Sequence, residues 1–158
     1  MRLPRYARAF AKTLQRFPWI VTIANVGYRS LRPKVTLGVA AVIVNEQGEI
    51  LLVEHIFHPM FPWGLPGGWV DAREHPETAI LRELREQIKV TATIEQLLLC
   101  ELVTPAHLDF AYLCTIEEPV ESVSSELLDF GWFSPQQLPP LVRFQASAIQ
   151  KALQQKLM

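Results

Sequence analysis

A stretch in the middle of the chain carries side chains whose types and spacing could do chemistry. Glu83 and Glu86 lie three positions apart and Gln87 follows, so a helix through them places all three side chains on one face. Gly67 and Gly68 precede a short acidic turn, and glycine lets a backbone approach a ligand closely. Carboxylate oxygens gathered in this way are the donors that hard cations such as Mg²⁺ prefer. The stretch therefore predicts an oxygen-rich site for a divalent cation.

The same stretch predicts the helix that would hold this polar face, from about residue 76 to residue 88. Pro76 suits the first turn of a helix, because the N–H that proline lacks would be unpaired there anyway. Ile80, Leu84 and Ile88 recur every four residues and form an apolar stripe. We expect this stripe to face the core, so that the carboxylates are presented from a fixed support.

Strands and helices are mixed along the rest of the chain. Residues 35–45 and 49–56 are rich in β-branched and aliphatic residues and flank a Glu-Gln-Gly turn, so we expect them to form a hairpin. Residues 91–103 and 108–117 are predicted as longer strands, and residues 141–158 as a final amphipathic helix. This order lacks regular βαβ alternation. It indicates an α/β fold of the α+β or layered α/β/α type, with a largely mixed sheet.

The charge distribution separates the start of the chain from the remainder. The length of 158 residues, with 49% hydrophobic residues, favours one domain with a sizeable core. Residues 1–34 carry eight Lys or Arg and no acid, whereas the rest carries seven bases and all sixteen acids. We therefore distinguish a basic, amphipathic, helical N-terminal arm at residues 1–33 from a domain at residues 34–158. Residues 4–17 predict one amphipathic helix of this arm, and residues 18–31 a second helix or an irregular apolar segment.

The arm has several possible partners. It could pack on its own chain, support a homodimer, or make a peripheral contact with a membrane surface. No apolar run approaches the roughly 18 residues that are needed to span a bilayer. The net charge of −1 suggests no polyanionic partner, so we expect no stable nucleic-acid partner. A cytoplasmic location is the expectation.

The residues from Gly68 to Val90 resemble the Nudix box of the MutT-like hydrolases. The box reads glycine, five residues, glutamate, seven residues, Arg-Glu, an aliphatic residue, any residue, Glu-Glu, any residue, glycine and an aliphatic residue. The chain matches it at Gly68, Glu74, Arg82, Glu83, Leu84, Glu86 and Val90. The strands before the box, the WGLPGG approach and the segment from Glu126 to Pro139 also look like a Nudix domain. The resemblance covers roughly residues 34–140.

The resemblance implies a fold and an activity. The fold would be an α/β/α sandwich whose box forms a loop–helix–loop. The activity would be hydrolysis of a diphosphate bond in a nucleoside diphosphate linked to another moiety, with Mg²⁺ or Mn²⁺. These cations neutralise the diphosphate and lower the pKa of a bound water.

The resemblance also implies roles for individual residues. The metal would be held by the Gly67 carbonyl and by side chains at Glu83, Glu86, Gln87 and Glu126. Glu83 could alternatively be the base that orients the attacking water. Glu74 would support the metal site or its water shell, and Arg82 would pair with a box carboxylate and hold it in place.

Two positions depart from the box. Gln87 stands where the family has a second glutamate, and it keeps one coordinating oxygen but loses a negative charge. Lys89 stands where the family has glycine, a residue that tolerates a positive φ at a helix end. These departures motivate an alternative function. The chain could be a catalytically weak or inactive Nudix module that binds a nucleotide as a sensor or regulator.

Substrate contacts are sought in the loops around the box. His55 follows a strand and enters a loop, and Arg73 lies in the box loop, where it could reach a phosphate. Trp63 could stack on a base, although its place just before LPGG also fits packing. No base-recognition pattern is readable in these loops. ADP-ribose, a nucleotide sugar and an ordinary or oxidised nucleoside triphosphate all stay open as substrates.

Overall fold

The computed structural model describes residues 15–30 and 34–156, which belong to two compact units divided after Lys34. The first unit contains helix α2, Pro18–Ser30, at the position predicted to be a helix or an irregular segment. Most of the helix predicted at residues 4–17, namely residues 4–14, lies outside the described residues. None of the helices in the described part of the chain has the length and apolar character that crossing a bilayer requires.

The second unit begins at Val35 and contains strands in two sheets with two helices. Its elements are β1 (Thr36–Ile43), β2 (Ile50–His55), β3 (Trp63–Gly64), β4 (Gly67–Trp69), α3 (Pro76–Ile88), β5 (Ala92–Thr104), β6 (His107–Ile116), β7 (Leu127–Phe133) and α4 (Arg143–Lys156). The predicted bounds of α3 are confirmed, and the long strands and the final helix lie within about two residues of their predicted places.

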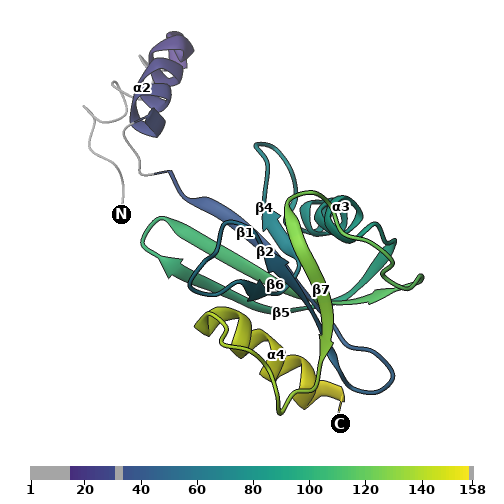
Figure 1. Ribbon diagram of the computed structural model, residues 1–158. Helices are drawn as coiled ribbons and strands as arrows, with labels where there is room; N and C mark the ends of the chain where they lie inside the picture. Colours follow the sequence, from purple (N-terminus) through teal and green to yellow (C-terminus); the bar gives the residue numbers. More distant parts are fainter. Residues whose placement is uncertain (1–14, 31–33, 157–158) are drawn as a thin grey trace. The chain divides into compact units, whose positions relative to one another are not determined.

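The strands are ordered β4-β1-β6-β5 in one sheet and β3-β2-β7 in the other (Figure 1). β1 pairs with β6 in parallel, whereas its pairing with β4 and the other strand pairings are antiparallel. The predicted hairpin of β1 and β2 is wrong, because the two strands enter different sheets and meet through the bridge between Val44 and Ile50. β1 pairs instead with β4 and β6, and β2 pairs with β3 and β7.

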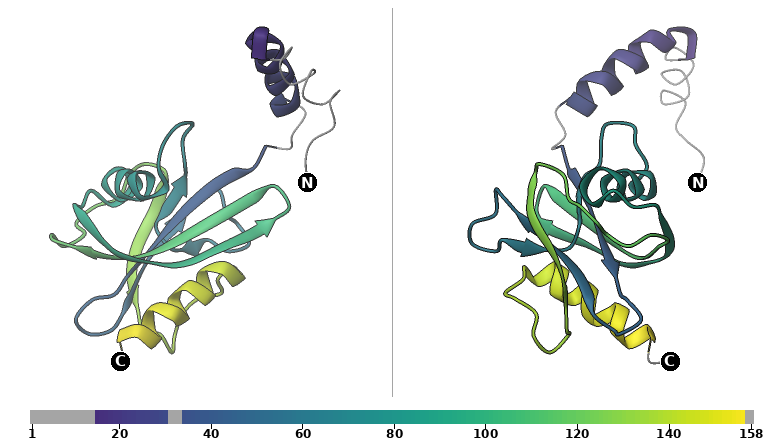
Figure 2. Two further views of the ribbon diagram at one scale, coloured as in Figure 1. Left: turned by 180° about the vertical axis from the view of Figure 1, so that it is seen from behind. Right: turned by 45° about the vertical axis from the view of Figure 1, so that its right-hand side comes forward.

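The core consists of two apolar layers, one on each face of β1 and β2. Alternate β1 residues Val39, Ala41 and Ile43 pack with the buried stripe of α3. The intervening Ala40 and Val42 pack instead with residues of α4. Because successive strand side chains point to opposite faces, a strand buried on both faces is a continuous apolar run. Figures 1 and 2 show the strands between α3 and α4, which confirms the α/β/α sandwich with a mixed sheet.

Candidate active site

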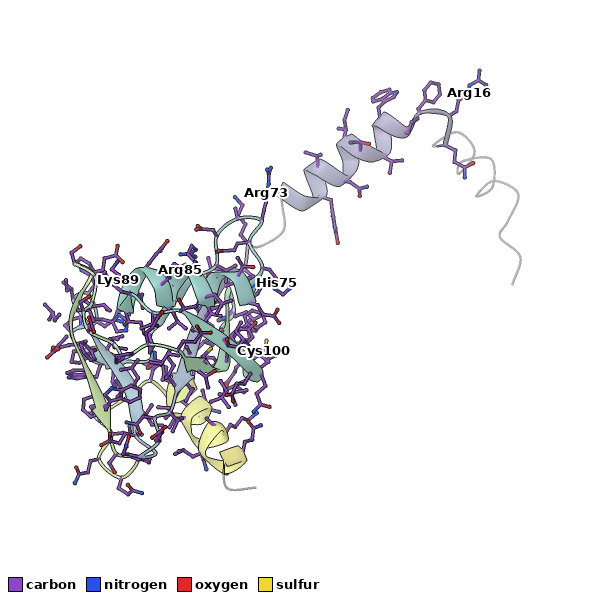
Figure 3. All side chains as sticks on the ribbon, turned by 90° about the vertical axis from the view of Figure 1, so that its right-hand side faces the viewer. Arg16, Arg73, His75, Arg85, Lys89 and Cys100 are labelled. Carbon is purple, nitrogen blue, oxygen red and sulfur yellow. The ribbon has the colours of Figure 1, made fainter. Side chains whose placement is uncertain are left out.

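Helix α3 supports the box carboxylates in the way that its sequence pattern predicts. His75 precedes it in an extended conformation, and Pro76 occupies its first turn. Ile80, Leu84 and Ile88 are fully buried against the core, and the polar site residues lie beside this stripe, from the buried Gln87 to the exposed Glu86. His75 and Lys89 mark the two ends of this helix in Figure 3.

The end of α3 keeps a left-handed turn although glycine is absent. Lys89 has φ 59° and ψ 31°, a conformation that costs a residue with a Cβ on the order of 1 kcal/mol or more. Its Nζ donates a hydrogen bond to the Glu86 carbonyl at 2.8 Å. A cation at this end of the helix is also favoured by the helix dipole, so both effects offset the strain.

The glycine pair lies on β4, directly against β1 and α3. Gly67 has φ 154°, and a Cβ there would overlap the backbone of Val39 and Ala40. A Cβ on Gly68 would lie 2.5 Å from the carboxyl carbon of Glu83. The two glycines are therefore needed for two different close approaches, one to a neighbouring strand and one to a box carboxylate.

Arg82 connects the box carboxylates to one another. Its Nε and Nη2 donate to the two oxygens of Glu74 at 3.0 and 2.9 Å, in a bidentate ion pair. Its Nη1 donates to Glu83 at 2.9 Å and to Glu86 at 3.2 Å. Nη2 also donates to the Trp69 carbonyl at 2.9 Å, which ties α3 to the end of β4. One guanidinium thus fixes three carboxylates and one strand end.

The electrostatics differ between the carboxylates that contact Arg82. Hydrogen bonding to Arg82 is the main reason why the pKa of Glu74 lies below its ordinary value, and the Asp71 N–H adds to it. Burial is the main reason why the pKa of Glu83 lies above its ordinary value. Arg82 opposes this shift, while the negative charges of Glu86 and Glu126 reinforce it. Glu83 therefore binds a proton more readily than an exposed glutamate does.

Gln87 is the one polar or charged residue that is buried among the described residues, with 7% of its surface exposed. Its Oε1 accepts a hydrogen bond from the Gly67 N–H at 3.0 Å. Its Nε2 donates to the Gly67 carbonyl at 2.7 Å. The side chain and the carbonyl that the resemblance assigns to the metal are thus hydrogen-bonded to each other.

These residues open onto a cleft of about 350 Å³. Glu83, Gln87 and Glu126 line it together with the glycine pair, although Glu126 comes from the segment before β7. Glu86 is 61% exposed and touches the group through Arg82 rather than by lining this cleft. The structure therefore places Glu126, which lies 40 positions after Glu86, in the same cleft as Glu83 and Gln87.

Two further hollows adjoin the cleft, and His55 and His58 line all three. The rings of His55 and His58 lie 4.9 Å apart. Burial, followed by the charge of His58, lowers the pKa of His55. Trp63 lines the second hollow, of about 330 Å³, and also packs edge-on against Phe133 at 4.9 Å. Both interpretations of Trp63, packing and substrate contact, thus fit its position.

Arg73 is placed differently from the other candidates. It lies on the loop that leads into α3, where Figure 3 labels it, with φ 71° and an exposed side chain. None of the hollows described above includes it in its walls. The structure does not bring Arg73 to the box carboxylates, so its contact with substrate stays a prediction.

The third hollow, of about 180 Å³, contains a polar group that the sequence reasoning missed. His107 lies between Thr36 and Asp109, with its Nδ1 2.8 Å from the Thr36 hydroxyl and its Nε2 2.7 Å from the Asp109 carboxylate. Trp69 packs against the same imidazole at 4.8 Å. The parallel register of β1 and β6 pairs Thr36 with His107, residues that are 71 positions apart. No local pattern in the sequence signals that pairing.

The donor set can be compared with the needs of a divalent cation. Within the described residues no three His, Cys, Asp or Glu side chains are arranged to hold a metal ion. The chemistry nevertheless fits a hard cation, because carboxylate oxygens are the donors that such a cation prefers. Glu86 and Glu126 lie close enough to Glu83 for their negative charges to raise its pKa. The Gly67 carbonyl fits less well, because the Gln87 amide already donates to it.

The profile of the NUDIX domain matches residues 34–153. A MutT-like protein of Streptomyces ambofaciens is 28% identical over 107 residues, which are 67% of this chain and 68% of that protein. An 8-oxo-dGTP diphosphatase of Haemophilus influenzae is 46% identical over 55 residues, but the match covers 34% of this chain and only 40% of that protein. The crystal structure of an ADP-ribose pyrophosphatase of Streptococcus suis superposes with a TM-score of 0.62 at 26% identity, covering 80% of this chain and 92% of that chain.

Proposed function

This chain belongs to the NUDIX domain family, and we propose that it is a metal-dependent hydrolase of a nucleoside diphosphate linked to another moiety. Membership of the family, together with its similarity to an ADP-ribose pyrophosphatase, supports hydrolysis of a diphosphate bond in general. The observation that supports metal dependence and a nucleoside diphosphate substrate is the cleft that Glu83 and Glu126 line beside the glycine pair. Two carboxylates that line one cleft suit a divalent cation, and glycine lets a ligand approach the backbone closely.

In this proposal Glu83, Glu86 and Glu126 would hold Mg²⁺ or Mn²⁺. The bound cation supplies neutralisation of the diphosphate charge and activation of water for attack on phosphorus. Alternatively, Glu83 would be the base that orients the attacking water and accepts its proton, because burial raises its affinity for a proton. Arg82 and Glu74 position the carboxylates through the hydrogen bonds described above. The products are two, and one of them is a phosphate monoester.

The groups on either side of the diphosphate would lie in the hollows that adjoin the cleft. His55 lines all three hollows and stays uncharged more readily than an exposed histidine, so it can contact a neutral part of the substrate. Trp63 offers an aromatic surface in the hollow that also contains Phe57, Met60 and Phe61. Substrate candidates are ADP-ribose, nucleotide sugars, and ordinary or oxidised nucleoside triphosphates.

The test is a substrate panel with product identification. The full chain is incubated with these nucleotides, with Mg²⁺ or Mn²⁺ and with EDTA in parallel, and the products are identified by mass spectrometry. We expect at least one substrate to give a phosphate monoester, and we expect EDTA to abolish the reaction. Turnover that persists unchanged in EDTA would contradict the metal dependence.

A second candidate function is a nucleotide-binding module with weak or no hydrolysis, acting as a sensor or regulator. The contact that favours it is the pair of hydrogen bonds between Gln87 and Gly67, which engages two of the groups that the family resemblance assigns to the metal. This candidate predicts nucleotide binding by calorimetry without product release from the whole panel. Turnover that appears in the Gln87→Glu variant would then identify the missing carboxylate as the cause.

The N-terminal arm adds a separate proposal about partners. Helix α2 has no acidic residue and exposes large apolar side chains, among them Trp19 at 59% and Ile23 at 63%. With the basic residues that precede it in the sequence, this composition suits a peripheral contact with an anionic membrane surface. Co-sedimentation with anionic liposomes, with and without residues 1–33, tests it, and equal binding of both forms would remove the proposal.

The same two forms also test whether the arm supports a homodimer, because light scattering would show a smaller mass without residues 1–33. The cytoplasmic location stays a prediction.

A further inference from the structure

The hydrogen bonds of Gln87 are specific to an amide. The Gly67 N–H needs an acceptor and the Gly67 carbonyl needs a donor, and one primary amide satisfies both at 3.0 and 2.7 Å. This pairing fixes which end of the amide carries the nitrogen. The side chain is also buried, so water does not compete for these groups. The amide therefore satisfies both backbone groups of one residue of β4 in a closed ring of two hydrogen bonds.

A carboxylate at position 87 would be complementary to only one of the two Gly67 backbone groups. It could accept from the Gly67 N–H, but its second oxygen would face the Gly67 carbonyl oxygen without a hydrogen between them. Two oxygens in a buried site repel each other unless a proton or a cation lies between them. With glutamate at position 87, a cation would be needed between the carboxylate and the Gly67 carbonyl oxygen. With glutamine, the side-chain N–H lies in that place.

The same residue connects three parts of the site. Its side chain holds Gly67, and Gly67 is followed by Gly68, whose backbone lies against the Glu83 carboxylate. Its own carbonyl accepts a hydrogen bond from the Ser124 N–H at 2.8 Å, in the segment that carries Glu126. The side chain of Gln87 therefore holds β4 against α3, and its backbone carbonyl holds the Glu126 segment.

We propose that Gln87 is a positioning residue whose buried amide replaces one divalent cation, so that the Gly67 loop is held in place without metal. The site then takes one cation fewer than it would with glutamate at position 87. Cations that bind do so at Glu83, Glu86 and Glu126, away from the Gly67 carbonyl. The inference rests on the proposed function only in assuming that this is a site for divalent cations, and its test does not use catalysis.

The experiment measures thermal unfolding and Mn²⁺ binding of the full chain at neutral pH. The variants are Gln87→Glu, Gln87→Ala and, as the matched control, Gln150→Glu at an exposed position of α4. In EDTA we expect the melting temperatures of Gln87→Glu and Gln87→Ala to lie about 5 °C or more below that of wild type. The control should have the same melting temperature as wild type. With saturating Mn²⁺ we expect the deficit of Gln87→Glu to close and that of Gln87→Ala to persist.

Mn²⁺ titration followed by calorimetry should give one more bound ion per chain for Gln87→Glu than for wild type. If Gln87→Glu does not fold in EDTA, its folding upon addition of Mn²⁺ supports the proposal equally. In wild type, the Gly67 amide should be protected from hydrogen exchange to the same degree in EDTA and in Mn²⁺. Protection that requires Mn²⁺, or equal ion counts for both proteins, would overturn the proposal.

These outcomes are separable from those of the substrate panel. If the wild-type chain has no hydrolytic activity, the melting and hydrogen-exchange measurements still test the role of Gln87. A wild-type chain that binds no Mn²⁺, beside a Gln87→Glu variant that binds one, supports the role of the amide and contradicts the metal dependence of the proposed function.

Discussion

The substitution Gly68→Ala tests whether the position of one carboxylate controls activity. A Cβ on Gly68 would lie 2.5 Å from both the carboxyl carbon and Oε1 of Glu83, and 2.7 Å from Oε2. Since ordinary contact begins near 3.4 Å, the carboxylate has to retreat by about 0.9 Å. A displacement of about 1 Å in a catalytic group costs on the order of a hundredfold in rate, or about 2.7 kcal/mol of activation free energy.

The same substitution should change stability much less than it changes activity. The atoms that collide belong to the end of a flexible side chain, which can rotate away, and Gly68 does not have a positive φ. The main loss is the hydrogen bond from Arg82 Nη1 to Glu83, a partly exposed ion pair worth about 1 kcal/mol or less. We therefore expect turnover to fall about a hundredfold while the melting temperature falls by about 4 °C or less.

The assay compares kcat on the preferred substrate with thermal unfolding of the same preparations. Gly27→Ala is the matched control, because a Cβ on Gly27 meets no atom within 4 Å and alanine favours the helix. Its turnover should equal that of wild type. Gly68→Ala turnover within about threefold of wild type would refute the reasoning. A melting temperature lowered by more than about 10 °C would also refute it, because the backbone rather than Glu83 would then have moved.

Three further predictions address charge, pH and packing. Glu83→Gln and Glu86→Gln should each reduce kcat at least about a hundredfold with little change in melting temperature, and unchanged rates would contradict their roles. His55 has a pKa below its ordinary value of 6.5, so its contribution to the free energy of unfolding should be present above pH 6.5 and be lost as the pH falls below it. Denaturant titrations over this window should show a shallower decline for His55→Asn. Leu84→Ala should lower the free energy of unfolding by about 2–5 kcal/mol, because Leu84 is fully buried on the core-facing side of α3.

The local elements and most of the candidate site could be predicted from sequence periodicity and spacing. The bounds of α3 follow from Pro76 and from the buried stripe of Ile80, Leu84 and Ile88, because helix geometry depends on near neighbours. The carboxylates of the box follow from the same spacing. The order of the elements indicates an α+β or layered α/β/α fold, and the resemblance to the Nudix family selects the α/β/α sandwich that the fold confirms. What these features share is that a few consecutive residues determine each of them.

Strand partners were beyond the reach of the sequence. The run at residues 35–56 has the pattern of a hairpin, yet β1 and β2 separate into two sheets. The sequence of an apolar strand does not indicate which strand it will pair with. β1 pairs with β6 and β2 pairs with β7, and both partners lie much later in the chain. For the same reason the contact of Thr36 with His107 depends on a parallel register that no local pattern encodes.

The sequence by itself determined that glutamine replaces a glutamate at position 87, and that glycines approach the box. Only the tertiary structure decided what that glutamine does, because its two hydrogen-bond partners lie on Gly67, twenty positions earlier in the chain. The sequence likewise placed Arg82 among acids, but the bidentate contact with Glu74 depends on how the loop before α3 folds back. Residue types and local geometry are written along the chain, whereas the pairing of buried polar groups is fixed only when distant segments pack.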